Sequence, residues 1–249
     1  MEIHHHPDLH HRKKRWREYF IEFIMIFLAV TLGFFAESYR ESRADRSKEM
    51  EYIKAMLEDA QTDTANYQEA INLNMIRAGV LDSLARLCYN YNGNSDKDIY
   101  RLYRRALRHP DFANPTERTL MQLKNSGGMR MLQRKVAVDS IINYDDFAKK
   151  LGDQRDAYTK FLAGIMEESM DMINYDNYAF DTASSIAVRV FEANKTPKLM
   201  NTDKTKLIKF GNRAMSFKGV VLFYMVRLRE GKQHALNLIT TLRREYKPE

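Results

Sequence analysis

Residues 207–242 read LIKFGNRAMSFKGVVLFYMVRLREGKQHALNLITTL, and the spacing of apolar residues in this stretch decides the fold class. Apolar or small residues recur in alternating steps of three and four, which places them on one face of an α-helix. This seam comprises Leu207, Phe210, Ala214, Phe217, Val221, Tyr224, Leu228, Gly231, Ala235, Leu238 and Leu242. Phe217, Val221 and Tyr224 lie at its middle, so we expect them to be buried.

The rest of the chain continues the helical pattern. Ten glycines and five prolines are few for 249 residues, and no long run alternates with period two. Apolar steps of three and four predict one long helix ending near Tyr89 and another over about 129–175, with a shorter one over about 182–193. The chain is therefore predicted to be all-α, an elongated helical bundle in which the 207–242 seam packs against the two long helices. Pairing of this seam with its copy in a homo-oligomer is the alternative.

Two signals predict how the helices between these long ones begin and end. In Asn-Pro-Thr-Glu, Asn114 is expected as the N-cap of a helix, Pro115 as its first residue and Glu117 two residues later. The corner Ser-Gly-Gly that follows this helix needs a left-handed residue. We therefore expect either Gly127 or Gly128 to have a positive φ.

The N-terminal region contains an apolar stretch of membrane-spanning length. Residues 19–36 carry one charge, Glu22, and a helix of this length covers about 27 Å, close to the ~30 Å hydrocarbon core of a bilayer. A tagged soluble protein and a cleaved signal peptide are the alternatives. The bulky Phe35 and Tyr39 fit poorly beside a cleavage site, which favours an uncleaved signal anchor. The predicted organisation is a tail over 1–18, a transmembrane helix over 19–36 and an outer domain over 37–249.

Charges beside this stretch predict its orientation. Five Lys and Arg residues crowd positions 12–17, whereas the basic residues after the stretch alternate with acids. By the positive-inside rule the tail is cytoplasmic, and residues 37–249 are periplasmic on a single-pass inner-membrane protein. Trp16, Tyr19 and Tyr39 lie where aromatic residues contact the membrane interface.

Glu22 is the one ionisable group within the apolar stretch, and such groups are costly in hydrocarbon. Because it is close to the cytoplasmic edge, it can reach the interface or meet Arg15. Contact with a neighbouring chain is the alternative. We therefore expect the lipid bilayer as one partner, and a protein partner or a homo-oligomer of unknown identity as another.

Few residues are candidates for chemistry. The tail is His-rich, which makes it a weak metal-binding candidate, although a flexible tract lacks groups that orient ligands. These histidines are His4, His5, His6, His10 and His11. Cys88 lies in an apolar helical stripe and is expected to be a core residue. The acids of 142–147 and 173–178 lack the turn-forming glycine of a calcium loop, so a solvated face is the preferred interpretation.

Two stretches resemble a known group of proteins. EYFIEFIMIFLAVTLGFFAESYRE (18–41) and TLMQLKNSGGMRMLQRKVAVDSIINYDDF (119–147) are similar to single-pass membrane proteins of unknown function from Bacteroidota. The first fifty residues carry most of this resemblance, and the Ser-Gly corner carries the rest. The resemblance implies an envelope location and histidines native to the tail. It implies no activity.

The composition and motifs favour a binding function over catalysis. Lys and Arg exceed Asp and Glu by 7, but the excess is spread among acids, so nucleic acid is not an expected partner. No nucleophile elbow, zinc-protease, phosphate-loop or dinucleotide motif occurs, and we expect neither an enzyme nor a cofactor. A membrane-tethered scaffold or adaptor of the cell envelope is the preferred hypothesis. The alternative is a periplasmic ligand-sensing bundle that signals through a separate subunit.

Overall fold

The computed structural model describes residues 15–107, 112–181, 188–191 and 196–247. Its elements are, in chain order, α1 (Trp16–Tyr89), α2 (Asp96–Ala106), α3 (Arg118–Asn125), the 3₁₀ turn η1 (Gly128–Arg130), α4 (Lys135–Ser169), the 3₁₀ turn η2 (Tyr175–Asn177), β1 (Tyr178–Asp181), β2 (Val188–Phe191) and α5 (Lys204–Tyr246). The chain divides into two units, Met1–Glu51 and Tyr52–Glu249. The predicted helical fold with a long apolar N-terminal helix is confirmed.

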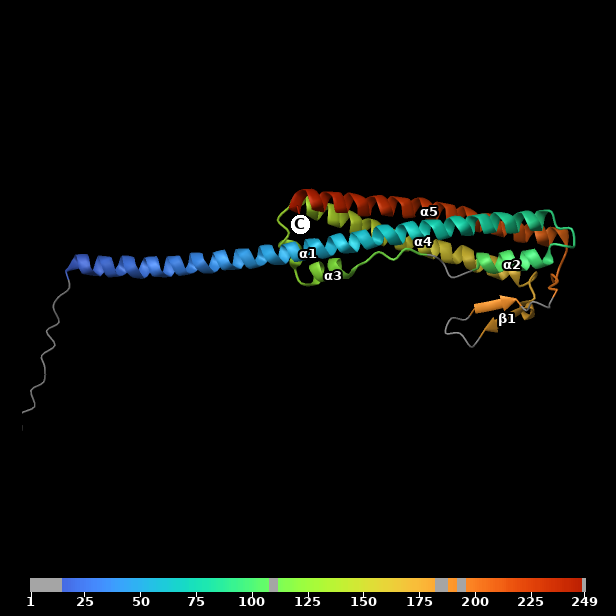
Figure 1. Ribbon diagram of the computed structural model, residues 1–249, viewed down its shortest axis with the longest axis horizontal. Coiled ribbons are helices and arrows are strands. Elements are labelled where there is room, and N and C mark those ends of the chain that lie inside the picture. Colours follow the sequence, from blue (N-terminus) through green and yellow to red (C-terminus); the bar gives the residue numbers. More distant parts are fainter. Residues whose placement is uncertain (1–14, 108–111, 182–187, 192–195, 248–249) are drawn as a thin grey trace, which may run out of the picture. The chain divides into compact units, whose positions relative to one another are not determined.

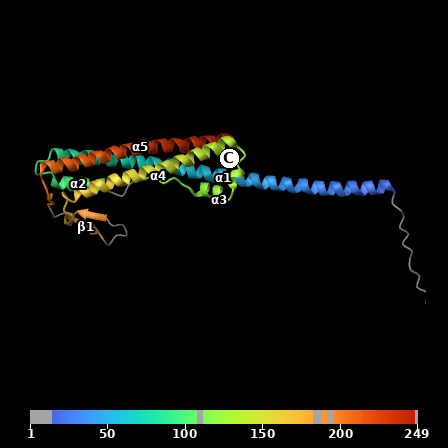
Figure 2. The same cartoon turned by 180° about the vertical axis from the view of Figure 1, so that it is seen from behind.

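The second unit is a bundle of three long helices. The part of α1 that follows Tyr52, together with α4 and α5, forms its body, and the three helices lie side by side in both views (Figures 1 and 2). α4 and α5 pack against each other. α2 and the strand pair cover one end of the bundle, and α3 lies at the other end near the C-terminal end of α5.

The 207–242 seam is buried as predicted, within one chain. Phe217 and Val221 are 0% exposed and Tyr224 is 1% exposed. Every other position of the seam is also buried. The helix begins after Asp203, whose side chain accepts a hydrogen bond from the backbone N–H of Lys206 at 3.0 Å. Because the seam is fully covered by its own chain, it is a core feature and has no need of a second copy.

Two glycines of α5 lie against tyrosine rings of α1. A Cβ atom at Gly211 would lie 2.7 Å from Cε1 of Tyr89, and a Cβ at Gly231 would lie 2.7 Å from Cε1 of Tyr67. Real Cβ atoms do not approach other atoms this closely, so each ring occupies space that only a glycine leaves open. Both contacts fix the register of α1 against α5.

The predicted helix start at Asn114 and Pro115 is wrong. α3 begins four residues after Asn114, at Arg118, with Glu117 as its N-cap residue and no capping bond from that side chain. The reason is a cap from another helix. Asp59 of α1 accepts hydrogen bonds from the backbone N–H and the hydroxyl of Thr119, which satisfies donors that the start of a helix leaves unpaired.

The Ser-Gly-Gly corner has the expected left-handed residue. Gly127 has φ +70°, whereas Gly128 begins η1 with an ordinary backbone conformation. Space at Gly128 is also tight, because a Cβ there would lie 3.0 Å from Leu123 and 3.3 Å from Tyr52. The helix predicted over about 129–175 is shorter than expected at both ends, since α4 covers Lys135–Ser169.

The short helix predicted over about 182–193 is wrong where the structure describes it. Val188–Phe191 forms β2, which pairs antiparallel with β1, and Tyr178 lies opposite Phe191. The sequence Val-Arg-Val-Phe alternates with period two and is rich in residues that favour strands. This four-residue signal was outweighed by the helical pattern around it. Residues 182–187 and 192–195 lie outside the described residues.

Candidate interaction surface

α1 contains a candidate membrane span. Among the described residues it is the one helix long and apolar enough to cross a bilayer, and no residue of its most apolar stretch is buried in the structure. The aromatic rings of this stretch have one another as neighbours, with centroids 6.2 Å apart for Phe23 and Phe27. A large apolar surface without a protein cover is what lipid would cover.

The residues predicted to lie at the membrane interface are also exposed. Trp16 stacks on Phe20 with ring centroids 5.9 Å apart, and Arg43 lies over the ring of Tyr39 at 5.9 Å. Tyr19, Glu22 and Arg15 are exposed too. Their roles at a membrane or a partner stay predictions. His4, His5, His6, His10 and His11 lie outside the described residues.

The described residues contain no group of three or more His, Cys, Asp or Glu side chains that could hold a metal ion. In the first acidic segment Asp145 instead binds Lys124 and Lys149, each at 2.6 Å. In the second unit Cys88 is buried, and burial raises the pKa of its thiol to about 12. A thiol with so high a pKa is protonated at neutral pH and is a poor nucleophile.

A row of buried polar residues follows the inner face of α1. Asp59, Asp63, Asn74 and Arg77 are all buried, and with Tyr67 they recur at helical spacing beside the apolar stripe. The sequence analysis did not identify this row. The available signal was that these polar residues keep the phase of the apolar ones.

Asp63 joins three elements near this row. Its carboxylate accepts hydrogen bonds from the backbone N–H and the hydroxyl of Thr116, both at 2.7 Å, and from the hydroxyl of Tyr144 on α4. Burial, with the nearby Tyr67 and Asp63, raises the pKa of Tyr144 far above its usual range. Tyr144 is therefore a permanent donor, and the charge of Asp63 is compensated by hydrogen bonds.

Aromatic rings fill the bundle beside Arg77 and Asn74. Tyr158 accepts a hydrogen bond from Arg77 and donates one to Asn74 at 3.1 Å. Its ring meets that of Phe217 edge-on at 5.1 Å, and it has similar contacts with Phe112 and Tyr224. These rings pack on one another edge to face in the core of the bundle.

The outer side of α1 and α5 carries exposed apolar side chains. Met75 and Ile76 on α1 and Leu222, Phe223 and Val226 on α5 are each between 44% and 57% exposed. We call these five residues the apolar patch. Other exposed apolar side chains of this unit lie elsewhere, such as Met121 on α3 and Ile208 near the start of α5. A patch on a bundle whose core is otherwise well covered indicates a contact surface.

Polar pairs on both sides of the apolar patch fix how α1 and α5 are aligned. Lys218 binds Asp82 at 2.5 Å, and Lys232 binds Gln68 at 2.7 Å. The two helices are therefore antiparallel, and fourteen residues of α1 align with fourteen residues of α5 between these pairs. Ile76, eight residues after Gln68, lies level with position 224, so the exposed apolar residues of the two helices lie at neighbouring levels along the bundle.

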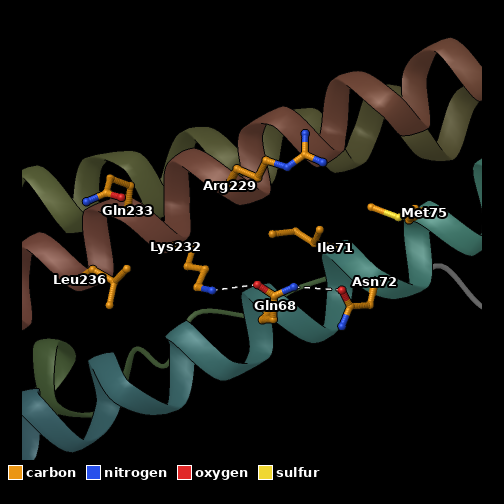
Figure 3. Close-up of a pocket in the computed structure, with 8 residues that line it drawn as sticks. All are labelled: Gln68, Ile71, Asn72, Met75, Arg229, Lys232, Gln233 and Leu236. Carbon is orange, nitrogen blue, oxygen red and sulfur yellow. Dashed lines mark hydrogen bonds between the residues drawn. The ribbon is translucent and has the colours of Figure 1, made fainter.

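A groove of about 400 Å³ adjoins the apolar patch. Figure 3 shows its lining from α1 and α5, with the hydrogen bond from Lys232 to Gln68 crossing between the helices. Met75 belongs to both the groove and the apolar patch. The groove lining is otherwise mostly amide and charged side chains, namely Gln68, Asn72, Arg229, Lys232 and Gln233, with Ile71 and Leu236.

A second groove, of about 430 Å³, lies between α4 and the segment before α3. Asn114 and Pro115 line it with Lys149, Gly152 and Arg155. Arg155 donates a hydrogen bond to the carbonyl of Ala113, which ties this segment to α4. Asn114 and Pro115, predicted to start a helix, therefore form part of a surface groove.

No protein-family model matches the chain, and no curated protein or solved structure matches it either. The resemblance to Bacteroidota membrane proteins therefore stays a prediction. Function has to be argued from the span, the apolar patch and the grooves.

Proposed function

We propose that the protein is a membrane-tethered helical scaffold or adaptor of the cell envelope, acting through protein–protein contact. The observation that carries the proposal is the apolar patch, the exposed apolar side chains of α1 and α5. The core of the bundle is complete without these five large apolar side chains, and their exposure to water costs free energy unless a partner covers them. The candidate span on the same chain supplies the tether.

In this proposal residues 1–18 are cytoplasmic and residues 37–249 are periplasmic, with the span in the inner membrane. The support is the concentration of basic residues before the span. No catalytic reaction, cofactor or nucleic-acid contact is assigned. The His-rich tail is assigned contact with lipid headgroups, and metal binding is the alternative role for it.

Ligand sensing is the second candidate function, and neither of the two grooves described above has the lining that it calls for. A sensor of small molecules would need an apolar, enclosed pocket lined by side chains such as Tyr and Met. The groove in Figure 3 has one methionine and no tyrosine, and the groove beside α4 has neither. The tyrosines Tyr67, Tyr158 and Tyr224 are instead buried in the core.

The location is tested by adding protease to intact spheroplasts that contain the full chain. Degradation of the region after the span is expected, and full protection would overturn the orientation. Carbonate extraction tests the tether, since the chain should stay in the membrane fraction. Release into the supernatant would contradict it.

The contact role is tested by chemical crosslinking of the full chain in native membranes. A crosslinked species is expected for the wild-type chain and for Met121→Asp, which places a charge on an exposed position of another element. Leu222→Asp should remove that species, because a buried unpaired carboxylate is costly. If all three chains crosslink alike, the apolar patch is not the contact surface.

A further inference from the structure

We infer that the groove of about 400 Å³ between α1 and α5 binds an acidic segment of a partner protein, which also carries apolar side chains. The inference rests on the proposed function and names the chemistry of the partner. Three properties of the groove lining shown in Figure 3 carry it. They are positive charge that no acid neutralises, hydrogen-bond donors without an acceptor, and exposed apolar side chains.

The first property concerns charge. Two lysines of α5 contact α1, but their partners differ. Lys218 binds the carboxylate of Asp82 at 2.5 Å, whereas in the groove Lys232 binds the neutral amide oxygen of Gln68 at 2.7 Å. Arg229 also lines the groove, is exposed, and forms no ion pair with another described residue. Among the described residues no acid lines the groove, so both of its positive charges favour a negatively charged partner.

The second property concerns hydrogen bonds. Figure 3 shows Lys232 reaching from α5 to Gln68, whose amide nitrogen in turn donates to the amide oxygen of Asn72 at 2.9 Å. Both amide oxygens therefore have a donor. The amide nitrogen of Asn72, the remaining N–H groups of Lys232 and the guanidinium of Arg229 are left as donors. Gln233 is the exception, because its amide nitrogen is used in a hydrogen bond on α5. A carboxylate only accepts hydrogen bonds, so it matches these donors.

The third property concerns the apolar part of the lining. Ile71 is buried in the groove, whereas Met75 and Leu236 line it and are exposed to water. A small anion would satisfy the donors but would leave these two side chains exposed. A peptide segment with apolar residues beside its acids covers them as well, and this burial is favourable. The occupant that matches the whole lining is therefore a protein segment.

The two longest segments outside the described residues do not have this chemistry. Residues 1–14 contain five histidines and the basic run Arg12, Lys13 and Lys14, and residues 182–187 carry no charge. Neither segment combines several acids with apolar side chains. The acidic segment is therefore assigned to another protein.

The test measures the binding of fluorescent peptides to the full chain in nanodiscs of zwitterionic lipid, by fluorescence anisotropy. One peptide alternates Glu and Leu, which suits an extended backbone, and another places Leu on one face of a helix and Glu elsewhere. At least one of the two should bind. The matched peptide with Gln in place of every Glu should bind about tenfold more weakly or less. Absence of binding by both acidic peptides, or equal binding of the Glu and Gln versions, overturns the inference.

Removal of charge from the groove tests the site. Arg229→Gln and Lys232→Gln should each weaken binding of the acidic peptide about threefold to tenfold. Arg243→Gln is the matched control, because Arg243 is an exposed residue of α5 outside the groove lining. Far-UV circular dichroism confirms that the variants fold. If Arg243→Gln weakens binding as much as Arg229→Gln does, the peptide responds to overall charge and the groove is not its site.

Addition of a carboxylate inside the groove tests the charge argument in the opposite way. Gln68→Glu keeps the size of the side chain and gives Lys232 the kind of partner that Asp82 gives Lys218. Peptide binding should then fall about threefold to tenfold, because the groove contains its own acid. Gln61→Glu adds the same charge at an exposed position of α1 outside the groove lining and should leave binding unchanged. Equal binding by Gln68→Glu and the wild type contradicts the inference.

These outcomes separate the inference from the proposed function. If no acidic peptide binds but Leu222→Asp still removes the crosslinked species, the scaffold proposal stands and the acidic partner is wrong. If the peptide binds as expected but Leu222→Asp crosslinks like the wild type, the groove is a binding site and the apolar patch is not the contact surface.

Discussion

Ile26 and Ile53 are the same side chain on the same helix, yet Ile26 is 62% exposed and Ile53 is 0% exposed. Around Ile26 every face of α1 is apolar, and no residue from 19 to 36 is buried. Around Ile53 the apolar residues keep to one stripe, which the rest of the bundle covers, and polar residues share that stripe. A helix that is apolar on every face is suited to a lipid environment, whereas a helix with a single apolar stripe is suited to packing against other protein elements.

The largest effect is expected from a substitution in the core of the Tyr52–Glu249 unit. Phe217→Ala deletes a fully buried ring that packs against Tyr158, and we expect a loss of about 3–5 kcal/mol in the free energy of unfolding. Urea unfolding of the full chain in micelles, followed by far-UV circular dichroism, measures it. Ile208→Ala on the exposed side of α5 is the control, with an expected change within about 0.5 kcal/mol. Equal effects of the two changes would contradict the assigned core.

The next change tests the first half of α1. Val30→Arg places a charge in the middle of the apolar stretch, where membrane insertion is expected to become about 2.5–3.5 kcal/mol less favourable. The fraction of chain retained after carbonate extraction should fall. The same substitution should leave the unfolding midpoint of the Tyr52–Glu249 unit unchanged. Val30 belongs to the other unit, and its side chain is 68% exposed. A lowered midpoint would show that the two halves are not independent.

A smaller effect is expected at the corner beside the start of the second half. Gly127 has φ +70°, so Gly127→Val should cost about 1 kcal/mol or more of stability through backbone strain. Gly127→Asn is the matched control, because asparagine tolerates the left-handed region and should cost less. Thermal melting of both variants gives the comparison. Identical melting temperatures would show that the corner adapts without strain.

The smallest effect concerns the ion pair between α1 and α5. The hydrogen bond from Lys218, helped by Arg86, lowers the pKa of Asp82 below its ordinary value of about 3.9. A carboxyl with a lowered folded-state pKa contributes stability above the ordinary value and loses it as the pH falls through the folded pKa. The stability difference between the wild type and Asp82→Asn should therefore be small, and it should have its maximum value at neutral pH.

That difference should shrink as the pH falls through the lowered pKa of Asp82, and vanish once the carboxyl is protonated in both folded and unfolded chains. Urea unfolding at several pH values measures it. A difference that persists in acid would assign the effect of Asp82→Asn to packing instead of charge.

The sequence predicts burial where it follows from the spacing of neighbouring residues. It does not predict features that depend on contacts between residues far apart in the chain. The α5 seam was predicted residue by residue, because burial at Phe217 or Tyr224 follows from steps of three and four. The start of α3 was not, because Asp59, sixty residues before Thr119, supplies its cap. Only the folded chain brings the two together.

The candidate site was harder to predict than the core. Leu222 and Val226 are visible as apolar residues in the sequence, but they lie outside the periodic seam, and the pattern does not say whether another element covers them. The folded chain leaves them 44% and 45% exposed. The strand pair carries a readable period-two signal at Val188–Phe191, although it is only four residues long.

The tyrosine rings that lie on Gly211 and Gly231 have a mechanical consequence. Tyr67 and Tyr89 are about six helical turns apart on α1, and each occupies a place where α5 has no side chain. Sliding α5 by one turn, about 5.4 Å, would bring residues such as Met215 and Ala235 beneath these rings. A one-turn ratchet is thereby blocked at two separate points. A force applied at one end of the bundle should therefore move α1 and α5 together, without sliding of one helix past the other.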